Sequence, residues 1–193
     1  MNHRKLPRDF YARPTLEIAR DLIGKVLVTQ SRAGATAGRI VEVEAYIGED
    51  DPACHAAPGP TTRNAPLYGP PGFAYVYLNY GLHNLVNAVT EAEGSPAAVL
   101  VRALEPLEGL PVMQRRRARA GAPAHRRTPV TICDGPGNLT VAMGLTLADN
   151  RADLTGQRVW IEDRGLAATE IDWTPRIGIR VGLDRLWRAR EVV

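Results

Sequence analysis

The sequence FAYVYLNYGLHNLVNAVT, residues 73–90, decides the fold. Two runs rich in aromatic and β-branched residues, which are typical of strands, flank Asn79-Tyr80-Gly81. Asn and Gly accept the positive φ angles that tight turns require. The segment is therefore predicted to be a β-hairpin with Tyr80 at its tip, where a large aromatic side chain is unusual.

Further elements are predicted on both sides of this hairpin. The strand candidates are KVLVTQ (25–30), GRIVEVEAYI (38–47), AAVLVRAL (97–104), VWIED (159–163) and RIGIRVG (176–182). Helices are expected after Thr15, which we expect to cap the first of them, and within residues 105–120 and 135–145. Strands outnumber helices without regular alternation. We predict an α+β fold: a single domain of residues 1–193 with a curved, mainly antiparallel β-sheet, a protruding β-hairpin and surrounding helices.

The composition fits one globular domain with its own core, since 45% of the 193 residues are apolar and 23% are charged. The two cysteines, Cys54 and Cys133, follow no metal-ligand spacing, and the amino terminus MNHRKLPRDF is basic and polar, unlike a signal peptide. No apolar run approaches the roughly 20 residues that span a bilayer. We expect a cytoplasmic protein with no contact to a membrane.

The charge pattern permits a polyanionic partner. The net charge is +3, and because Lys5 and Lys25 are the only lysines among 24 basic residues, 22 are arginines. Arginine forks suit phosphate groups, although arginine-rich codon usage would give the same count. Six arginines are expected to form a solvated basic face or a track for phosphates: Arg115, Arg116, Arg117, Arg119, Arg126 and Arg127.

Two glutamates share one face of the predicted strand 38–47. Side chains alternate along a strand, so Glu42, Glu44 and Tyr46 point one way, whereas Val41 and the other apolar residues between them point to the opposite face. The two carboxylates then lie about 7 Å apart. Inverting glycoside hydrolases use carboxyl pairs at such distances as acid and base. An exposed face with two solvated glutamates is the alternative.

A histidine stands at the start of a long irregular segment. His55, in DDPACHAAPG, lies close to the Pro/Gly-rich stretch 58–72, which we interpret as a loop. His55 is expected to orient a ligand, to join a metal site with Asp51 and Cys54, or merely to be satisfied by loop backbone. The spacing D-x-x-C-H matches no known ligand pattern.

Two polar residues interrupt apolar strands. A buried amide such as that of Asn87 must find hydrogen bonds or cost about 1–3 kcal/mol, so Asn87 either sets specificity or pins a neighbouring segment. Arg102 lies inside AAVLVRAL, where a buried guanidinium needs a carboxylate partner such as Glu44. An edge position with Arg102 in solvent is the competing interpretation.

Several motifs follow one another in a fixed order: V-E-x-E-A-Y (41–46), A-x-H (53–55), R-N (63–64), A-Y-V-Y-x-x-Y-G (74–81) and L-V-R-A-L-E-P-L-E-G (100–109). Together they resemble the alkyladenine (3-methyladenine) DNA glycosylase family, and the resemblance spans roughly residues 13–188. The resemblance implies a monofunctional enzyme that flips an alkylated purine out of double-stranded DNA and hydrolyses its N-glycosidic bond, leaving an abasic site.

The resemblance also implies roles for particular residues. Glu44 matches the general base that activates water, held with the help of Arg102 and the backbone carbonyl of Ile177. The remaining matches are the base-pocket residues Tyr46, His55, Tyr77 and Asn87, the last of which disfavours the 2-amino group of guanine, and the intercalating residue Tyr80. No metal and no cofactor are expected. We expect a monomer in a bacterial cytoplasm, associated with the nucleoid through DNA.

The sequence departs from the family pattern in two places. The usual G-P-x-K-L is GPGNL here, with Asn138 in place of a lysine. The chain stops at WRAREVV (187–193), so the last strand is expected to be short or missing, and no role is assigned beyond Gly178. Two other functions remain as hypotheses: a glycosidase for free nucleosides that uses Glu42 and Glu44, and a non-catalytic protein that binds damaged DNA.

Overall fold

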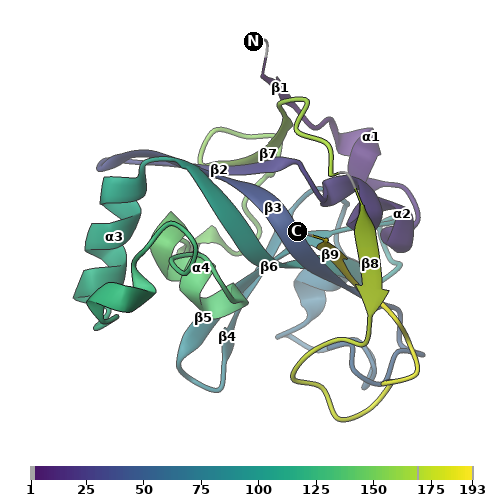
Figure 1. Cartoon of the computed structure of the whole chain (residues 1–193). Coiled ribbons are helices and arrows are strands. Elements are labelled where there is room, and N and C mark those ends of the chain that lie inside the picture. The colour runs from purple at the N-terminus through teal and green to yellow at the C-terminus, as the bar shows by residue number, and fades with distance from the viewer. Residues whose placement is uncertain (1–2, 169, 193) are drawn as a thin grey trace.

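The computed structural model describes residues 3–168 and 170–192 and is built around two long strands, β3 (Gly34–Ile47) and β6 (Ala97–Glu108) (Figure 1). These strands pair antiparallel from Ile47 opposite Ala97 to Ala37 opposite Glu108. Their inward-facing aliphatic side chains, with those of the helices, form the main core. The long pair fixes the positions of both glutamates of β3.

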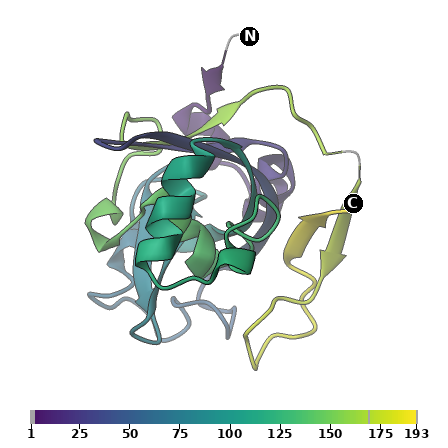
Figure 2. The ribbon, with the colours of Figure 1, turned by 60° about the vertical axis from the view of Figure 1, so that its left-hand side comes forward.

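The other elements extend this pair on both sides. The strands are β1 (Arg4–Lys5), β2 (Val26–Ser31), β4 (Ala74–Asn79), β5 (His83–Val89), β7 (Val159–Asp163), β8 (Ile171–Thr174) and β9 (Arg188–Glu191), and the α-helices are α1 (Arg8–Tyr11), α2 (Thr15–Leu22), α3 (Leu110–Arg119) and α4 (Pro136–Met143). The sheet order is β1-β7-β2-β3-β6-β5-β4, with β9 beside β3 and β8 beside β9, and the described pairings are antiparallel. In Figure 2 the sheet curves around α3 and α4. The predicted α+β fold is confirmed.

The predicted hairpin is present as β4 and β5 and protrudes from the sheet (Figure 1). Tyr80 and Gly81 have φ angles of 48° and 70°, and the Leu82 amide donates to the Asn79 carbonyl over 3.0 Å. A positive φ is unfavourable for a tyrosine, and such strained residues concentrate at functional sites. The Tyr80 side chain is 86% exposed, so the strain is not compensated by burial.

The predicted alternation along β3 is wrong at Val41. Ile40 pairs with Leu104 and Glu42 with Ala103, so Val41 is an extra residue between two paired ones. Such a β-bulge interrupts the alternation. Ile40 and Val43 face the core as a result, whereas Val41 is only half-buried.

The prediction of a strand at residues 176–182 is also wrong. On one edge of β3, residues 34–39 pair with β2. Residues 42–44 of the same edge pair with β9, and Arg188 of β9 lies opposite Glu44. The predicted segment instead belongs to a loop, residues 175–187, which connects β8 to β9. The last strand is present and has four residues.

Two further expectations about helices are corrected. Thr15 is the first helical residue of α2 and not its cap, and its hydroxyl donates to Glu91 over 2.6 Å. The six arginines do not form one basic face, because Arg117 is buried and Arg116 donates to the Ala142 carbonyl at the end of α4 over 2.9 Å. Across the described ranges, no helix combines the length and apolar character needed to cross a membrane.

Candidate active site

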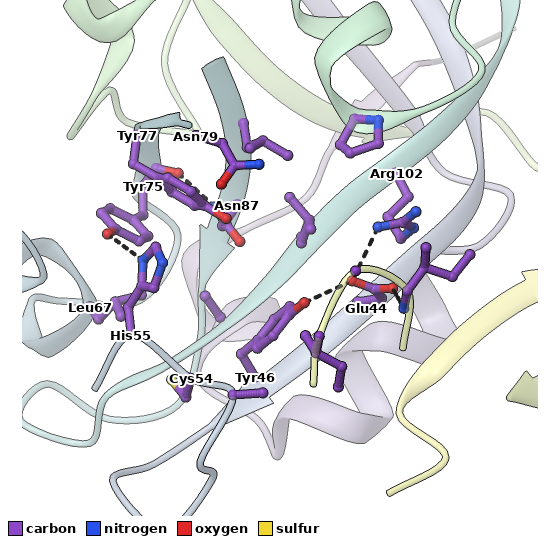
Figure 3. A pocket seen from close by; sticks show the side chains of 18 of the residues that line it. Glu44, Tyr46, Cys54, His55, Leu67, Tyr75, Tyr77, Asn79, Asn87 and Arg102 are labelled. Carbon is purple, nitrogen blue, oxygen red and sulfur yellow. Dashed lines mark hydrogen bonds and ion pairs between the residues drawn. The ribbon is translucent and has the colours of Figure 1, made fainter. Parts of the chain in front are cut away.

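A pocket of about 360 Å³ opens between the hairpin, β3, β6 and the loop 175–187 (Figure 3). The structure brings all of the candidate site residues to it: Glu44, Tyr46, His55, Tyr77, Tyr80, Asn87, Arg102 and Ile177. We call Glu44, Arg102 and Tyr46 the charged wall, and His55, Tyr75 and Tyr77 the aromatic wall. In Figure 3 the two walls lie on opposite sides of the opening.

Glu44 is fully buried, yet its carboxylate lies at the pocket. One oxygen, Oε2, accepts from the Tyr46 hydroxyl over 2.8 Å and lies 3.3 Å from Arg102 Nη1. The other oxygen, Oε1, accepts from the backbone amide of Ile177 over 2.6 Å. A buried carboxylate is costly unless it is paired and hydrogen-bonded, and these partners meet that requirement.

Arg102 is the buried partner predicted for Glu44. Its side chain is 11% exposed, so the competing prediction of an edge position in solvent is wrong. Besides its contact with Glu44, its Nε donates to Glu42 over 2.8 Å. Arg102 therefore bridges both glutamates of β3.

Glu42 lies outside the pocket and faces a second hollow. Its Oε1 accepts from Arg102 and, over 2.6 Å, from Arg188 Nε. Although burial alone would raise it, the pKa of Glu42 is lowered by hydrogen bonds from Arg188 and Arg102. The predicted pair of carboxylates that flanks one substrate is therefore wrong, and so is the alternative of two solvated glutamates, because both side chains are mostly buried and paired.

The aromatic wall consists of three rings in contact. The centroids of His55 and Tyr77 lie 4.5 Å apart at an interplanar angle of 66°, and those of Tyr75 and Tyr77 lie 5.2 Å apart. His55 Nδ1 lies 2.9 Å from the Tyr75 hydroxyl, which orients the imidazole ring. Tyr75 is 2% exposed and serves both the core and this wall. The surface is suited to stacking on a planar ring system.

Burial keeps the aromatic wall neutral. Burial, with a smaller contribution from Arg63, lowers the pKa of His55, and burial raises the pKa of Tyr77 to about 12. Across the opening, burial and the neighbouring Glu44 raise the pKa of Tyr46. The slot between Tyr46 and the aromatic wall is thus lined by uncharged rings at neutral pH.

The proposed grouping of His55 with Asp51 and Cys54 as metal ligands does not form. Both oxygens of the Asp51 carboxylate accept hydrogen bonds from Arg176, over 2.5 and 2.8 Å. Burial raises the pKa of the Cys54 thiol to about 11, which disfavours the thiolate that binds metals. Within residues 3–168 and 170–192, no cluster of three or more His, Cys, Asp or Glu residues is arranged to hold a metal ion.

Asn87 and Tyr80 occupy the hairpin side of the pocket. The Asn87 amide nitrogen donates to the Tyr75 carbonyl on the paired strand over 3.0 Å, so it both lines the pocket and pins its neighbour. Tyr80 lies at the pocket mouth with its ring in solvent.

Two residues that shape the site, Asn79 and Arg176, were missed by the sequence interpretation. Asn79 lines the pocket, and its position was available from strand alternation with Tyr75 and Tyr77. Arg176, which is buried and paired with Asp51, precedes Ile177 and thereby places the amide that binds Glu44. No local sequence pattern predicts the ion pair between Arg176 and Asp51, because these residues are far apart in the sequence.

The arrangement combines two chemical capacities. A carboxylate that is fixed by several donors can accept a proton from water in the pocket. A slot of neutral rings can hold a planar aromatic ligand beside that carboxylate. Together they are suited to breaking a bond between a sugar and an aromatic base.

Comparisons with known proteins agree with one another. The sequence model of a family described as "Methylpurine-DNA glycosylase (MPG)" matches residues 9–190. A protein of Methanocella arvoryzae named "Putative 3-methyladenine DNA glycosylase" is 53% identical over 187 residues, which cover 95% of this chain and 90% of the relative. A protein of the same name from Chlorobium phaeobacteroides is 48% identical over 186 residues, with coverages of 95% and 90%.

Proposed function

The chain belongs to the methylpurine-DNA glycosylase family and is a DNA glycosylase for alkylated bases, and from this premise we propose that it flips an alkylated purine out of duplex DNA and hydrolyses its N-glycosidic bond. The observation that carries the proposal is the buried carboxylate of Glu44 beside a slot of neutral rings. The product is an abasic site. We propose that residues 1–193 act as one glycosylase domain and as a monomer; a pocket lining that runs from Glu44 to Ile179 supports the single domain.

The slot between Tyr46 and the aromatic wall receives the extruded base. An N3- or N7-alkylated purine is cationic, and aromatic faces attract cations. The lowered pKa of His55 supports this role, because a neutral imidazole does not repel the charged base. Stacking on such rings is worth about 1–3 kcal/mol per base.

Glu44 acts as the general base. It takes a proton from water as the water oxygen bonds to C1′ of the deoxyribose, while the bond from C1′ to the purine breaks. The electron pair of that bond neutralises the cationic purine, so the leaving group needs no proton. The negative carboxylate also stabilises the oxocarbenium-like transition state.

Arg102 and Ile177 place the attacking water. The Arg102 guanidinium carries donors beside Glu44, and the Ile177 backbone lies at the same oxygen pair. The Ile177 amide is already used by Glu44, which leaves its carbonyl to accept from the water. Both groups therefore orient the water toward the sugar.

Tyr80 fills the space that the extruded base leaves in the duplex. Its ring is exposed at the hairpin tip, where it can enter a base stack as a wedge. Asn87 narrows the slot and disfavours the 2-amino group of guanine. Damaged bases unpair more readily than intact ones, and this contributes to selectivity.

The enzyme hydrolyses the N-glycosidic bond and does not cleave the DNA strand. A lyase step requires an amine nucleophile. Lys25 pairs with Asp163 at 2.6 Å, Lys5 donates to the Gly156 carbonyl, and neither residue lines the pocket. This placement supports a monofunctional glycosylase.

One assay tests the proposal. The protein is incubated with duplexes that each carry one methylated purine, hypoxanthine or etheno-adenine, and with the free nucleosides. We expect release of a modified base from duplex DNA, with strand breaks only after alkali. Release from nucleosides alone would identify a nucleoside glycosidase, and stable lesion binding without release would identify a damage-binding protein.

A further inference from the structure

Arg102 belongs to a row of alternating charges that runs away from the pocket. Its Nη1 lies 3.3 Å from Glu44 Oε2, and its Nε donates to Glu42 Oε1 over 2.8 Å. The same oxygen of Glu42 accepts from Arg188 Nε over 2.6 Å. Arg188 in turn donates from Nη1 to the Thr174 hydroxyl over 2.9 Å. The row joins three neighbouring strands and β8.

We propose that Glu42 and Arg188 are positioning residues for the reaction at Glu44: they fix the orientation of the Arg102 guanidinium and balance its charge. Neither residue lines the pocket. The inference rests on the proposed function and adds to it the residues that control the charge around Glu44.

The orientation follows from the shape of the guanidinium group. Its Nε and two Nη atoms form a rigid planar fork. Because Glu42 fixes the Nε, the Nη1 of Arg102 is directed at Glu44. The backbone supports this geometry, since Arg188 of β9 lies opposite Glu44 of β3 in the sheet register.

The charges explain why two residues are needed behind Arg102. An isolated cation beside Glu44 would keep the carboxylate ionised, but it would oppose the positive charge that develops on the sugar. Glu42 offsets this cation, and Arg188 offsets Glu42. Two carboxylates and two guanidinium groups leave the row neutral, so the cation beside Glu44 adds no net positive charge near the reacting sugar.

Other titratable and charged groups face the two glutamates, and the variants tested below leave these groups unsubstituted. Glu44 also faces Tyr46 on its own strand, Tyr77 on β4 and Arg176 in the loop 175–187, and Arg176 is neutralised by Asp51. On the far side of Glu42 and Arg188 lies the second hollow, of about 600 Å³, whose other charged residues are Arg39, Glu105, Asp134, Arg190 and Glu191. Glu42 and Arg188 line this hollow and not the pocket, so we expect their substitution to leave the slot for the base unchanged.

The test measures single-turnover base release against pH for Glu42→Gln, Arg188→Gln and the double variant. Glutamine at 42 keeps an oxygen acceptor for Arg102 but removes the negative charge. We expect the acid limb of the rate profile to move down by about one pH unit in Glu42→Gln and up by a similar amount in Arg188→Gln. The double variant should return the limb close to its original position.

Arg20→Gln is the matched control, since it makes the same charge change as Arg188→Gln at an exposed side chain that pairs with Asp21 at 3.1 Å and lines neither the pocket nor the second hollow. We expect its profile to be unshifted. Shifts in the same direction for Glu42→Gln and Arg188→Gln, or no shift in either, would overturn the proposal while normal wild-type release preserves the proposed function. A wild-type protein without base release would overturn both.

If a single variant fails to fold, Arg188→Lys replaces it, because lysine keeps the charge and loses the fork. We expect Arg188→Lys to leave the acid limb in place while lowering the plateau rate. An unchanged plateau together with an unchanged limb would also contradict a positioning role.

Discussion

The charged wall and the aromatic wall of the pocket are held in different ways. Glu44 and Arg102 project from the two central strands, are almost completely buried and share several short polar contacts. The aromatic wall comes from the hairpin and the segment before it, and a single polar contact, between His55 and Tyr75, joins its side chains. Ring contacts hold the remainder.

The difference matches two separate tasks. A group that reacts must be held in advance, because the transition state tolerates little error in position. A surface that stacks on a base needs area and neutrality more than directional bonds. We infer that chemistry and recognition are divided between the two walls, and the following substitutions should affect them separately.

Glu44→Gln should have the largest effect. Loss of the general base should lower the single-turnover rate of base release by about 10²–10⁴-fold, with affinity for the lesion duplex retained. Rate and affinity are measured on the same duplex. Glu93→Gln, at an exposed glutamate that does not line the pocket, is the control and should match the wild type. Full activity in Glu44→Gln would remove the proposed base.

Tyr77→Leu should show the reverse pattern. Loss of a stacking ring should weaken lesion binding about tenfold, with a smaller change in the rate at saturating enzyme. Tyr68→Leu is matched to it, because Tyr68 packs on the same small apolar cluster but binds Glu49 outside the pocket. Equal losses for both tyrosine variants would assign Tyr77 to packing alone.

Tyr80→Ala should act only on duplex DNA and more weakly than Tyr77→Leu. The ring at the hairpin tip is proposed to fill the gap in the stack, and a single strand has no such gap. Fluorescence titration with the same lesion in duplex and single-stranded form measures the difference. Val130→Ala removes another exposed side chain, outside the hairpin, and should change neither affinity.

The pH dependence of lesion binding should show the smallest effect. The pKa of His55 is lowered, so the imidazole stays neutral at pH values where a free histidine, near 6.5, is already half charged. Affinity for a cationic alkylated purine should be flat from pH 8 to about 6.5 and fall only when the pH passes below the lowered pKa. His55→Gln should abolish this decline, and a decline that is equal for a neutral lesion would contradict the explanation.

Local patterns in the sequence were sufficient to predict the hairpin, whereas the grouping of residues at the pocket came from the motif resemblance. Alternation of aromatic and β-branched residues indicated β4 and β5, and the motif resemblance supplied the residues of both walls except Tyr75. These signals work because a strand face and a turn depend on neighbouring residues.

The incorrect predictions concern contacts between distant segments. Residues 176–182 alternate like a strand, but residues 188–191 occupy the available edge of β3. The environment of Glu42 depends on Arg188, 146 positions away in the sequence. A bulge at Val41 depends on the register with β6. None of these features has a local signal, since each is decided by which segments meet in the folded chain.

The most direct test of the account is a crystal structure of Glu44→Gln bound to a duplex with one alkylated purine. The account predicts an extruded base between Tyr46 and the aromatic wall, with C1′ of its deoxyribose facing the side chain at position 44 and the Tyr80 ring in the duplex gap. A base that remains stacked in the duplex, or a sugar turned away from position 44, would contradict it.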